Sequence, residues 1–226
     1  MLSVIIPCFN EEKIIKNSIK RLLNWSENKN FYVEILIVNN NSTDKTQKEL
    51  NDFKNIENVL IIEELNKGKG FAVKKGLTKS QFDNILILDA DLSTDINQFD
   101  EKWLDENEIF FIGSRPLGNE IDTPIKRKIA GKILNFILRK IFNIKILDTQ
   151  CGFKFLKTRH LQILINEISI GGFLYDVDLI LSCIKNKIKV KEYPVEYFYN
   201  SDSSVSLFKD SMLMLKDVLI LRRKYD

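Results

Sequence analysis

Two aspartates, Asp89 and Asp91, follow directly on the apolar run at residues 85–88. Two carboxylates at the end of a buried strand repel each other unless a cation lies between them or water reaches both. Hard divalent cations such as Mg²⁺ or Mn²⁺ take oxygen ligands and commonly bridge protein carboxylates to substrate phosphates. The pair therefore predicts a metal site for a phosphate-bearing ligand. Asp-x-Asp alone fits a pair of helix-capping aspartates equally well.

A second candidate is the segment 66–70, which reads Asn-Lys-Gly-Lys-Gly ahead of a helical pattern. Backbone N–H groups at a helix N-terminus suit an anionic group, and Lys67 and Lys69 add positive charge. We therefore expect Lys69 to contact the anionic donor. The segment lacks the Gly-Lys-Ser/Thr ending of a P-loop. The alternative is a tight turn with solvated lysines.

Short apolar runs alternate with amphipathic stretches and predict the elements that must position these residues. We expect a helix over about residues 11–25 and strands at residues 2–6, 33–38, 59–62, 85–88 and 109–112, with another near 189–199. Alternating strands and helices of this length imply an α/β fold with a mainly parallel sheet and helices on both faces.

In an open parallel sheet, ligands bind beyond the carboxyl ends of the strands. The segments that follow the predicted strands are all polar, charged or glycine-bearing, and we expect them to gather along one edge. These segments are residues 7–11, 39–42, 66–70, 89–91 and 113–115.

Composition narrows the class of protein. The chain has 226 residues, which suits one domain over 1–226, and a net charge of +3, from which we expect no nucleic-acid partner. Its three cysteines fit neither a metal spacing nor a disulfide framework and favour a reducing compartment. The N-terminus lacks the pattern of a signal peptide, and no stretch approaches the roughly 20 apolar residues of a membrane span. We therefore expect a cytoplasmic protein whose membrane contact is peripheral.

Residues 125–139, preceded by Pro124, predict a basic amphipathic helix. Isoleucines recur every four residues beside a polar stripe of Lys128, Lys132, Asn135 and Arg139. Such a helix suits an anionic membrane surface, and a core-packing helix with a solvated basic edge is the alternative. Arg127 falls on the apolar side of this helix, where a guanidinium needs a partner such as a phosphate at the membrane boundary.

Taken together, these segments resemble the inverting family 2 glycosyltransferases, in particular the branch that glucosylates or mannosylates dolichyl phosphate. The resemblance runs from Ser3 to about Val205, and Asp-Thr-Gln-Cys-Gly-Phe-Lys at 148–154 is closer to the glucosyl version. Its motifs are Pro7-x-Phe9-Asn10-Glu11, the turn 38–44, Gly68-Lys69-Gly70, Asp89-x-Asp91, Gly113-Ser114-Arg115 and the 148–154 string. The resemblance implies the GT-A fold, with a nucleotide-sugar-binding half to about residue 115 and an acceptor-binding half from about 116 to 226.

The resemblance also implies roles for the donor-side residues. Pro7, Phe9 and Glu11 would contact the nucleoside, and Asp89 and Asp91 would hold Mg²⁺ or Mn²⁺ on the diphosphate. Family members usually have Asp where this chain has Asn39. An asparagine oxygen can accept the single N3–H of uracil, so a UDP-sugar is favoured over a GDP-sugar, and cytidine stays open.

On the acceptor side, Arg115 and Arg127 would receive a phosphate. We therefore expect an inverting transfer of a hexose, with glucose favoured, to a polyprenyl or dolichyl phosphate at a membrane surface. A phosphate monoester, with a second pKa of about 6, needs no general base. One alternative acceptor is a hydroxyl of a surface polysaccharide or lipid-linked glycan, which would need a base, and Asp178 is the candidate. A catalytically silent membrane-associated binding subunit is a third possibility.

Overall fold

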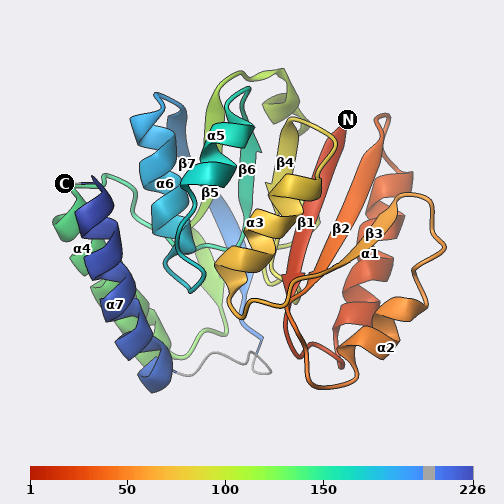
Figure 1. The fold of residues 1–226 in the computed structure, drawn as a ribbon, viewed down its shortest axis with the longest axis horizontal. Coiled ribbons are helices and arrows are strands. Elements are labelled where there is room, and N and C mark those ends of the chain that lie inside the picture. Colours follow the sequence, from red (N-terminus) through yellow and green to blue (C-terminus); the bar gives the residue numbers. More distant parts are fainter. Residues whose placement is uncertain (201–206, 226) are drawn as a thin grey trace.

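The computed structural model describes the backbone of residues 1–200 and 207–225, and the side chains of 1–200, 214 and 216–225. In this described part, seven strands form one sheet in the order β3-β2-β1-β4-β6-β5-β7 (Figure 1). The strands are β1 (Leu2–Cys8), β2 (Val33–Asn39), β3 (Val59–Glu63), β4 (Asn84–Ile87), β5 (Ile109–Ile121), β6 (Lys154–Lys157) and β7 (Lys189–Phe198).

The first half of the sheet is parallel, as the sequence predicted. β1 pairs in parallel with β2 and β4, and β2 pairs in parallel with β3. Every residue of β1 and β2 is buried. Continuous burial is what a parallel strand covered on both faces requires, and it explains the unbroken apolar runs of the sequence.

The second half contains a strand that the sequence did not reveal. β6 lies antiparallel between β4 and β5, and β5 pairs in parallel with β7. β5 also continues to Ile121, and its pairing with β7 shifts register between Ser114 and Asn119. The prediction of a loop at residues 113–115 is therefore wrong, because this segment is an inner part of a long strand.

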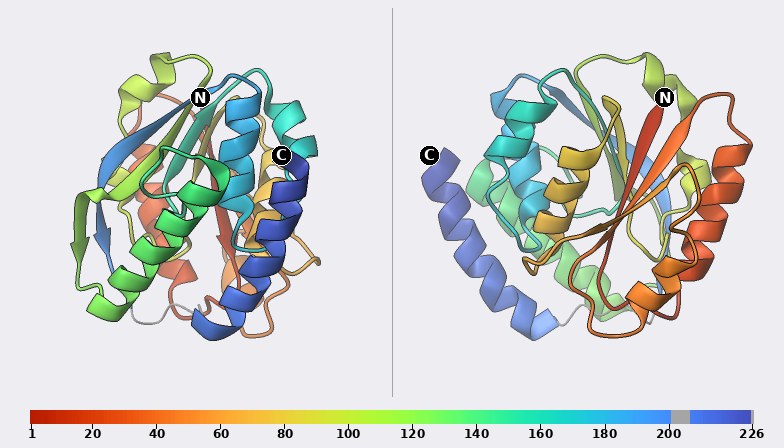
Figure 2. Two further views of the ribbon diagram at one scale, coloured as in Figure 1. Left: turned by 90° about the vertical axis from the view of Figure 1, so that its left-hand side faces the viewer. Right: turned by 45° about the vertical axis from the view of Figure 1, so that its right-hand side comes forward.

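Helices cover both faces of the sheet. They are α1 (Ile15–Glu27), α2 (Thr46–Asn51), α3 (Lys69–Lys79), α4 (Ile125–Phe142), α5 (Leu161–Glu167), α6 (Tyr175–Lys185) and α7 (Leu207–Tyr225), with two 3₁₀ turns, η1 (Ile96–Gln98) and η2 (Glu101–Asp105). α3, α5, α6 and α7 lie on the face turned to the viewer in Figure 1, and α1 and α4 lie on the other (Figure 2). The α/β fold with a mainly parallel sheet is thus confirmed.

The first helix begins four residues later than predicted. Asn10 has a φ of 58°, in the left-handed region, and the N–H of Glu11 donates to Thr46 Oγ1 at 2.8 Å. The segment between β1 and Ile15 is therefore held as a turn against the β2–α2 connection, and it can present side chains at the sheet edge.

α4 packs on the protein through a narrow face. Leu138 is fully buried, and the buried Asn135 accepts hydrogen bonds from the N–H and hydroxyl of Thr149 at 2.9 and 2.8 Å. The prediction that Asn135 belongs to an outward polar stripe is therefore wrong. The outward face instead carries an exposed apolar stripe, which consists of Ile125, Ile129, Ile133, Phe136 and Ile137.

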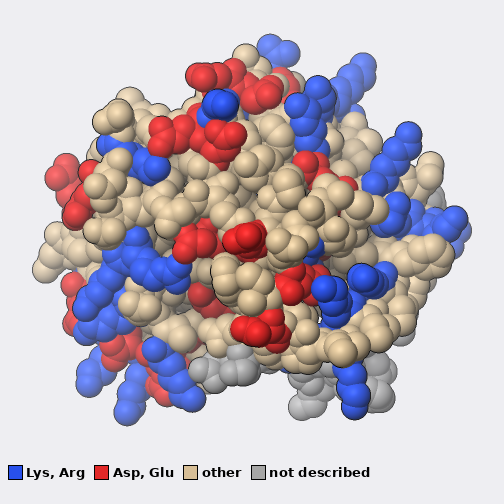
Figure 3. Space-filling view, turned by 180° about the vertical axis from the view of Figure 1, so that it is seen from behind, with Lys and Arg blue, Asp and Glu red and all other residues tan. Residues whose placement is uncertain are grey.

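Basic side chains border this apolar stripe. In the space-filling view from behind, Lys and Arg gather along the right-hand edge, where α4 lies (Figure 3). Among the described residues, no helix is long and apolar enough to cross a membrane.

The two faces of α4 should respond differently to truncation. Leu138→Ala removes a fully buried side chain and should lower the free energy of unfolding by about 2–5 kcal/mol. Ile137→Ala, the matched control one residue away, removes a side chain that is 44% exposed and should change it by less than about 0.5 kcal/mol. Urea titration of both variants measures the difference. Equal losses would show that the isoleucine stripe is part of the core.

Candidate active site

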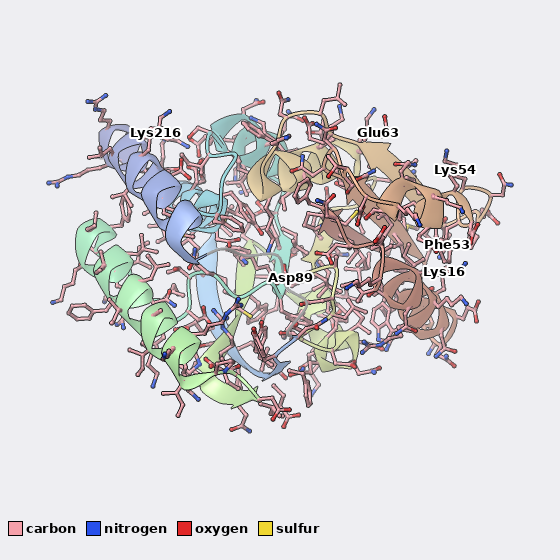
Figure 4. All side chains as sticks on the ribbon, turned by 90° about the horizontal axis from the view of Figure 1, so that it is seen from below. Lys16, Phe53, Lys54, Glu63, Asp89 and Lys216 are labelled. Atoms are coloured by element: carbon pink, nitrogen blue, oxygen red, sulfur yellow. The ribbon has the colours of Figure 1, made fainter. Side chains whose placement is uncertain are left out.

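The segments that follow the first four strands meet at one edge of the sheet. Viewed from below, Asp89 lies near the middle of this edge (Figure 4). Hydrogen bonds join the segments in order: Thr43 N to Asn10 Oδ1 at 2.8 Å, Asn40 Nδ2 to the Asn66 carbonyl at 2.6 Å, and Lys69 Nζ to Asp89 Oδ1 at 2.5 Å. The predicted gathering of these segments is confirmed.

Three carboxylates, Asp89, Asp91 and Glu11, crowd together here. Burial raises the pKa of Asp91, and the charge of Asp89 raises it further. Burial, with Asp91 and Asp89, raises the pKa of Glu11 to about 7. Burial also acts to raise the pKa of Asp89, but the Lys69 ammonium outweighs it, so this pKa lies below its usual value. The cluster carries more negative charge than its neighbours balance.

This donor set fits a divalent cation that also binds phosphate. Among the described residues, no group of three or more His, Cys, Asp or Glu side chains could hold a metal alone. Asp89 and Asp91 supply oxygen ligands of the kind that Mg²⁺ and Mn²⁺ prefer, and diphosphate oxygens would complete the shell. A cation between them would also relieve the repulsion that raises the pKa of Asp91.

Asp89 is pressed against the 148–154 segment. A Cβ on Gly152 would lie 1.9 Å from Asp89 Oδ2, so only glycine leaves room for this carboxylate. Two residues on, the fully buried Lys154 pairs with Asp176 at 2.8 Å. Both lysines lie near the Tyr175 ring, with Lys69 Nζ 5.9 Å and Lys154 Nζ 5.8 Å from its centroid.

In the glycine-rich turn at residues 66–70, two backbone N–H groups that we expected to face an anion are bonded within the protein. The N–H of Gly68 donates to Asn40 Oδ1 at 2.7 Å, and the N–H of Gly70 donates to the Gly171 carbonyl at 2.9 Å. These two N–H groups are therefore bonded inside the protein, and the anion-binding role of the rest of the segment, including Lys67 and Lys69, stays a prediction. The glycines are needed for close approach, since a Cβ on Gly68 would lie 2.1 Å from the Gly171 oxygen.

The predicted nucleoside contacts fall into two groups. Pro7 is buried, while Phe9 and Glu11 reach the surface of the edge. Asn39 is only 4% exposed, its Nδ2 donates to Gln47 Oε1 at 2.7 Å and its Oδ1 accepts from Ser42 N at 3.2 Å. Each end of the amide thus has one partner inside the protein, which leaves one N–H and one lone pair for a base, so the role of Asn39 in reading the base stays a prediction.

Arg115 forms a bidentate ion pair with Asp148. Its Nε and Nη2 donate to the two carboxylate oxygens at 2.6 and 2.9 Å, and its backbone N–H adds a third bond. Burial acts to raise the pKa of Asp148, but Arg115 outweighs it and holds this pKa below its usual value. The pair fixes the start of the 148–154 segment beside the Asp89 cluster.

Arg127 lies at the start of α4, with its guanidinium carbon 5.2 Å from the centroid of the Tyr199 ring. Tyr199 lines a cavity of about 330 Å³ whose wall also includes Asp91, Ser93 and Phe198. The N–H of Phe198 donates to the Ser93 carbonyl at 2.7 Å, which ties the end of β7 to the segment after Asp91. The cavity therefore connects the carboxylate cluster to the aromatic ring beneath Arg127.

Asp178 does not face this cavity. Its side chain is fully buried and accepts hydrogen bonds from Ser169 and Ile170 and from Lys224 and Tyr225 in the last turn of α7. Burial acts to raise its pKa, but the bond from Lys224 and its other donors outweigh this and keep the pKa below its usual value. The prediction of Asp178 as an acceptor base is therefore wrong, since a base must reach the hydroxyl.

Comparison with known protein families matches residues 3–164 to Glycosyl transferase family 2. The chain belongs to this family. A dolichyl-phosphate beta-glucosyltransferase of Trichomonas vaginalis is 30% identical over 212 residues, covering 87% of this chain and 65% of that protein. The enzyme of the same name from Saccharomyces cerevisiae is 30% identical over 250 aligned positions, covering 99% of this chain and 75% of that protein. The chain thus spans only part of the length of both relatives.

The family 2 chain shares its fold with glucosyl-3-phosphoglycerate synthase of Mycobacterium tuberculosis. A crystal structure of that protein with Mn²⁺, UDP-glucose and glycerol 3-phosphate superimposes with a TM-score of 0.70 at 15% identity, covering 98% of this chain and 79% of that chain. The predicted GT-A fold is confirmed. The resemblance noted to about Val205 ends in residues 201–205, which lie outside the described residues.

Two residues of this family 2 site received no role from the sequence. Gly152 makes room for Asp89, and Lys154 neutralises Asp176 in the interior. Lys154 stands between Phe153 and Phe155, and a charge inside an apolar run indicates a buried partner. No comparable signal pointed to Gly152, because its constraint comes from a residue 63 positions away in the sequence (Asp89).

The crowding of carboxylates makes stability depend on pH through Glu11. Its pKa is raised from 4.5 to about 7, so the folded chain holds this proton more tightly than the unfolded chain does. Deprotonation therefore lowers stability as the pH rises through this window, and the loss is constant above it. Glu11→Gln removes this loss. The melting temperature of the variant minus that of the wild type should therefore be larger at about pH 8 than at about pH 5.

Thermal unfolding at the two pH values in a chelating buffer measures this gain. Added Mn²⁺ should reduce it, because a cation among the carboxylates stabilises the ionised wild type. A difference between variant and wild type that does not change with pH would contradict the crowding.

Proposed function

We propose that the chain is an inverting glycosyltransferase that moves a hexose, with glucose favoured, from a UDP-sugar to a polyprenyl or dolichyl phosphate. The observation that carries this proposal is the cavity that joins Asp91 to Tyr199, the ring over which Arg127 lies. This cavity supports the proposal that a carboxylate site for a metal-bound diphosphate and a cationic site for an acceptor phosphate lie close together on the surface.

The donor side rests on Asp89 and Asp91, which would hold Mg²⁺ or Mn²⁺. When bound, the cation would neutralise charge that develops on the leaving nucleoside diphosphate. Lys69, with its ammonium 2.5 Å from Asp89 Oδ1, keeps that carboxylate ionised and oriented. Uridine is favoured because a protein of the same fold was crystallised with UDP-glucose and Mn²⁺. Glucose is favoured by the names of the relatives.

On the acceptor side, Arg127 would place the phosphate monoester. An oxygen of that phosphate bonds to the anomeric carbon while the bond from that carbon to the diphosphate oxygen breaks, which inverts the configuration. Because the phosphate is already largely ionised near neutral pH, the step needs no general base. This suits a site in which Asp178 is fully buried and bonded to α7.

Membrane contact would come from the exposed apolar stripe of α4. Ile125, at the start of the helix and two residues from Arg127, is 75% exposed, and Ile133 is 54% exposed. An apolar row bordered by Lys and Arg suits the boundary between lipid chains and anionic headgroups. Arg127 would then lie where the phosphate of an embedded lipid emerges, on the cytoplasmic face of the membrane that we expect this peripheral protein to contact.

The transfer can be tested by incubating the purified chain with UDP-[¹⁴C]glucose, Mn²⁺ and polyprenyl phosphate in detergent. We expect an organic-soluble, acid-labile product. Asp91→Asn should reduce its formation by about 100-fold or more, because the leaving group loses its charge compensation. Asp52→Asn, the matched control, alters an exposed carboxylate outside the cavity that pairs with Lys16 at 2.6 Å, and it should stay within about threefold. Full turnover of Asp91→Asn in a chelator would refute the metal role.

Arg127 should affect the acceptor more than the donor. Arg127→Ala should raise KM for polyprenyl phosphate by about tenfold or more and leave KM for the nucleotide sugar nearly unchanged, because a charged hydrogen bond to phosphate is lost. Lys126→Ala is the control, since Lys126 is an exposed cation next to it on the same helix. Equal increases in both KM values would argue against this assignment.

A further inference from the structure

The last turn of α7 is bonded to the interior through Asp178. Oδ1 of Asp178 accepts from Lys224 Nζ at 2.6 Å and from the Tyr225 hydroxyl at 2.8 Å. Its Oδ2 accepts from the N–H groups of Ser169 and Ile170 at 2.7 and 3.1 Å. One buried carboxylate therefore joins α7 to residues 168–172, which we call the α5–α6 segment.

The other side of the α5–α6 segment supports the start of α3. The Gly171 carbonyl accepts from Gly70 N at 2.9 Å, and the Ile168 carbonyl accepts from Lys74 Nζ at 2.8 Å. A Cβ on Gly70 would lie 2.2 Å from the Ile170 oxygen, so the two backbones are packed too closely to admit a side chain at this position. The α5–α6 segment is thus clamped between α7 and the helix that begins with Lys69.

A second contact holds the same segment from α7. A Cβ on Gly172 would lie 2.6 Å from Oδ2 of Asp217, so this carboxylate packs directly on the segment. α7 therefore meets the segment two turns apart, at Asp217 and, through Asp178, at Lys224. A shift of α7 would move the segment as a unit, because both of its ends are fixed to the helix.

We propose that Asp178 and Lys224 are positioning residues for Lys69, and that the docking of α7 sets the geometry of the donor site. Lys69 lies between Gly68 and Gly70, both of which rest on the α5–α6 segment, and its ammonium contacts Asp89 at 2.5 Å. Loss of the Lys224–Asp178 ion pair increases the mobility of the α5–α6 segment, and the Lys69–Asp89 contact is then less well ordered. The inference rests on the proposed function for the donor site, and it gives Asp178 a role that does not require contact with substrate.

The test compares Lys224→Met with Arg223→Met in the full chain, in buffer without lipid. The control removes the same charge from the neighbouring, exposed position of the same helix. Hydrogen exchange of residues 68–72 reports the Gly70 N–H bond to Gly171 directly. We expect exchange there to accelerate by about tenfold in Lys224→Met and to remain as in the wild type in Arg223→Met.

Calorimetric binding of Mn²⁺ and UDP gives the second readout. The Kd should rise by about tenfold in Lys224→Met, well below its melting temperature, and Lys224→Arg should restore most of the affinity because it keeps an N–H donor. A residue that only stabilised the fold would lower the melting temperature without changing exchange at 68–72 or the Kd.

The outcomes separate the two proposals. If Lys224→Met matches Arg223→Met in exchange at residues 68–72, the positioning role is overturned whatever the nucleotide result. If the wild type binds neither UDP nor any other nucleoside diphosphate with Mn²⁺, the proposed function fails, while the exchange comparison still decides whether α7 positions the α3 start. Should Lys224→Met fail to fold, Tyr225→Phe removes the other α7 bond to Asp178 and takes its place.

Discussion

The contact between Lys69 and Asp89 governs the arrangement of this sheet edge. Three carboxylates converge there, and the cations that the neighbouring strands supply, Lys154 and Arg115, are paired with Asp176 and Asp148. The cation in contact with Asp89 comes from a helix start, and it compensates Asp89 far more than Asp91 or Glu11. The remaining negative charge makes the edge suited to a divalent cation, and the same imbalance would be a defect in a purely structural site.

That contact depends on glycines for reasons other than backbone flexibility. Gly152 leaves space for the Asp89 carboxylate, while Gly68 and Gly70 let the start of α3 touch the α5–α6 segment. Of these, Gly68 also has a φ of 137°, which an L side chain rarely adopts. Two glycines of a motif that resembles a phosphate-binding turn therefore serve close packing in this fold. This packing also determines the position of Lys69.

The sequence predicted the parts of the fold whose cause is local. Unbroken apolar runs identified β1 and β2, because a strand buried on both faces must be apolar throughout. It also predicted that Asp89 and Lys69 share one edge, since that follows from strand direction alone. β6 escaped notice, because its four residues contain two lysines and its strand character comes from pairing with β4 and β5.

Side-chain orientation could not be predicted in the same way. Asn39 and Asp178 both have the residue type that their predicted roles require, yet both are hydrogen-bonded to neighbours, Asn39 to Gln47 and Asp178 to the last turn of α7. Hydrogen-bonding capacity is finite, and a buried amide or carboxylate is paired with whatever donors the fold brings to it. Sequence pattern shows which groups could act, but only the packed neighbours decide which of them remain available.

The availability of hydrogen-bond partners also explains why the last turn of α7 can affect the donor site through Asp178. Asp178 would be costly to bury alone, so the fold must supply cations and N–H groups to it from more than one element. The donors come from the α5–α6 segment on one side and from α7 on the other, so the Asp178 carboxylate links these two elements by hydrogen bonds. Because the far side of the segment is in close contact with Gly68 and Gly70, a displacement at Asp178 would be transmitted to the start of α3. A buried charge far from the reacting atoms thereby becomes part of what orients them.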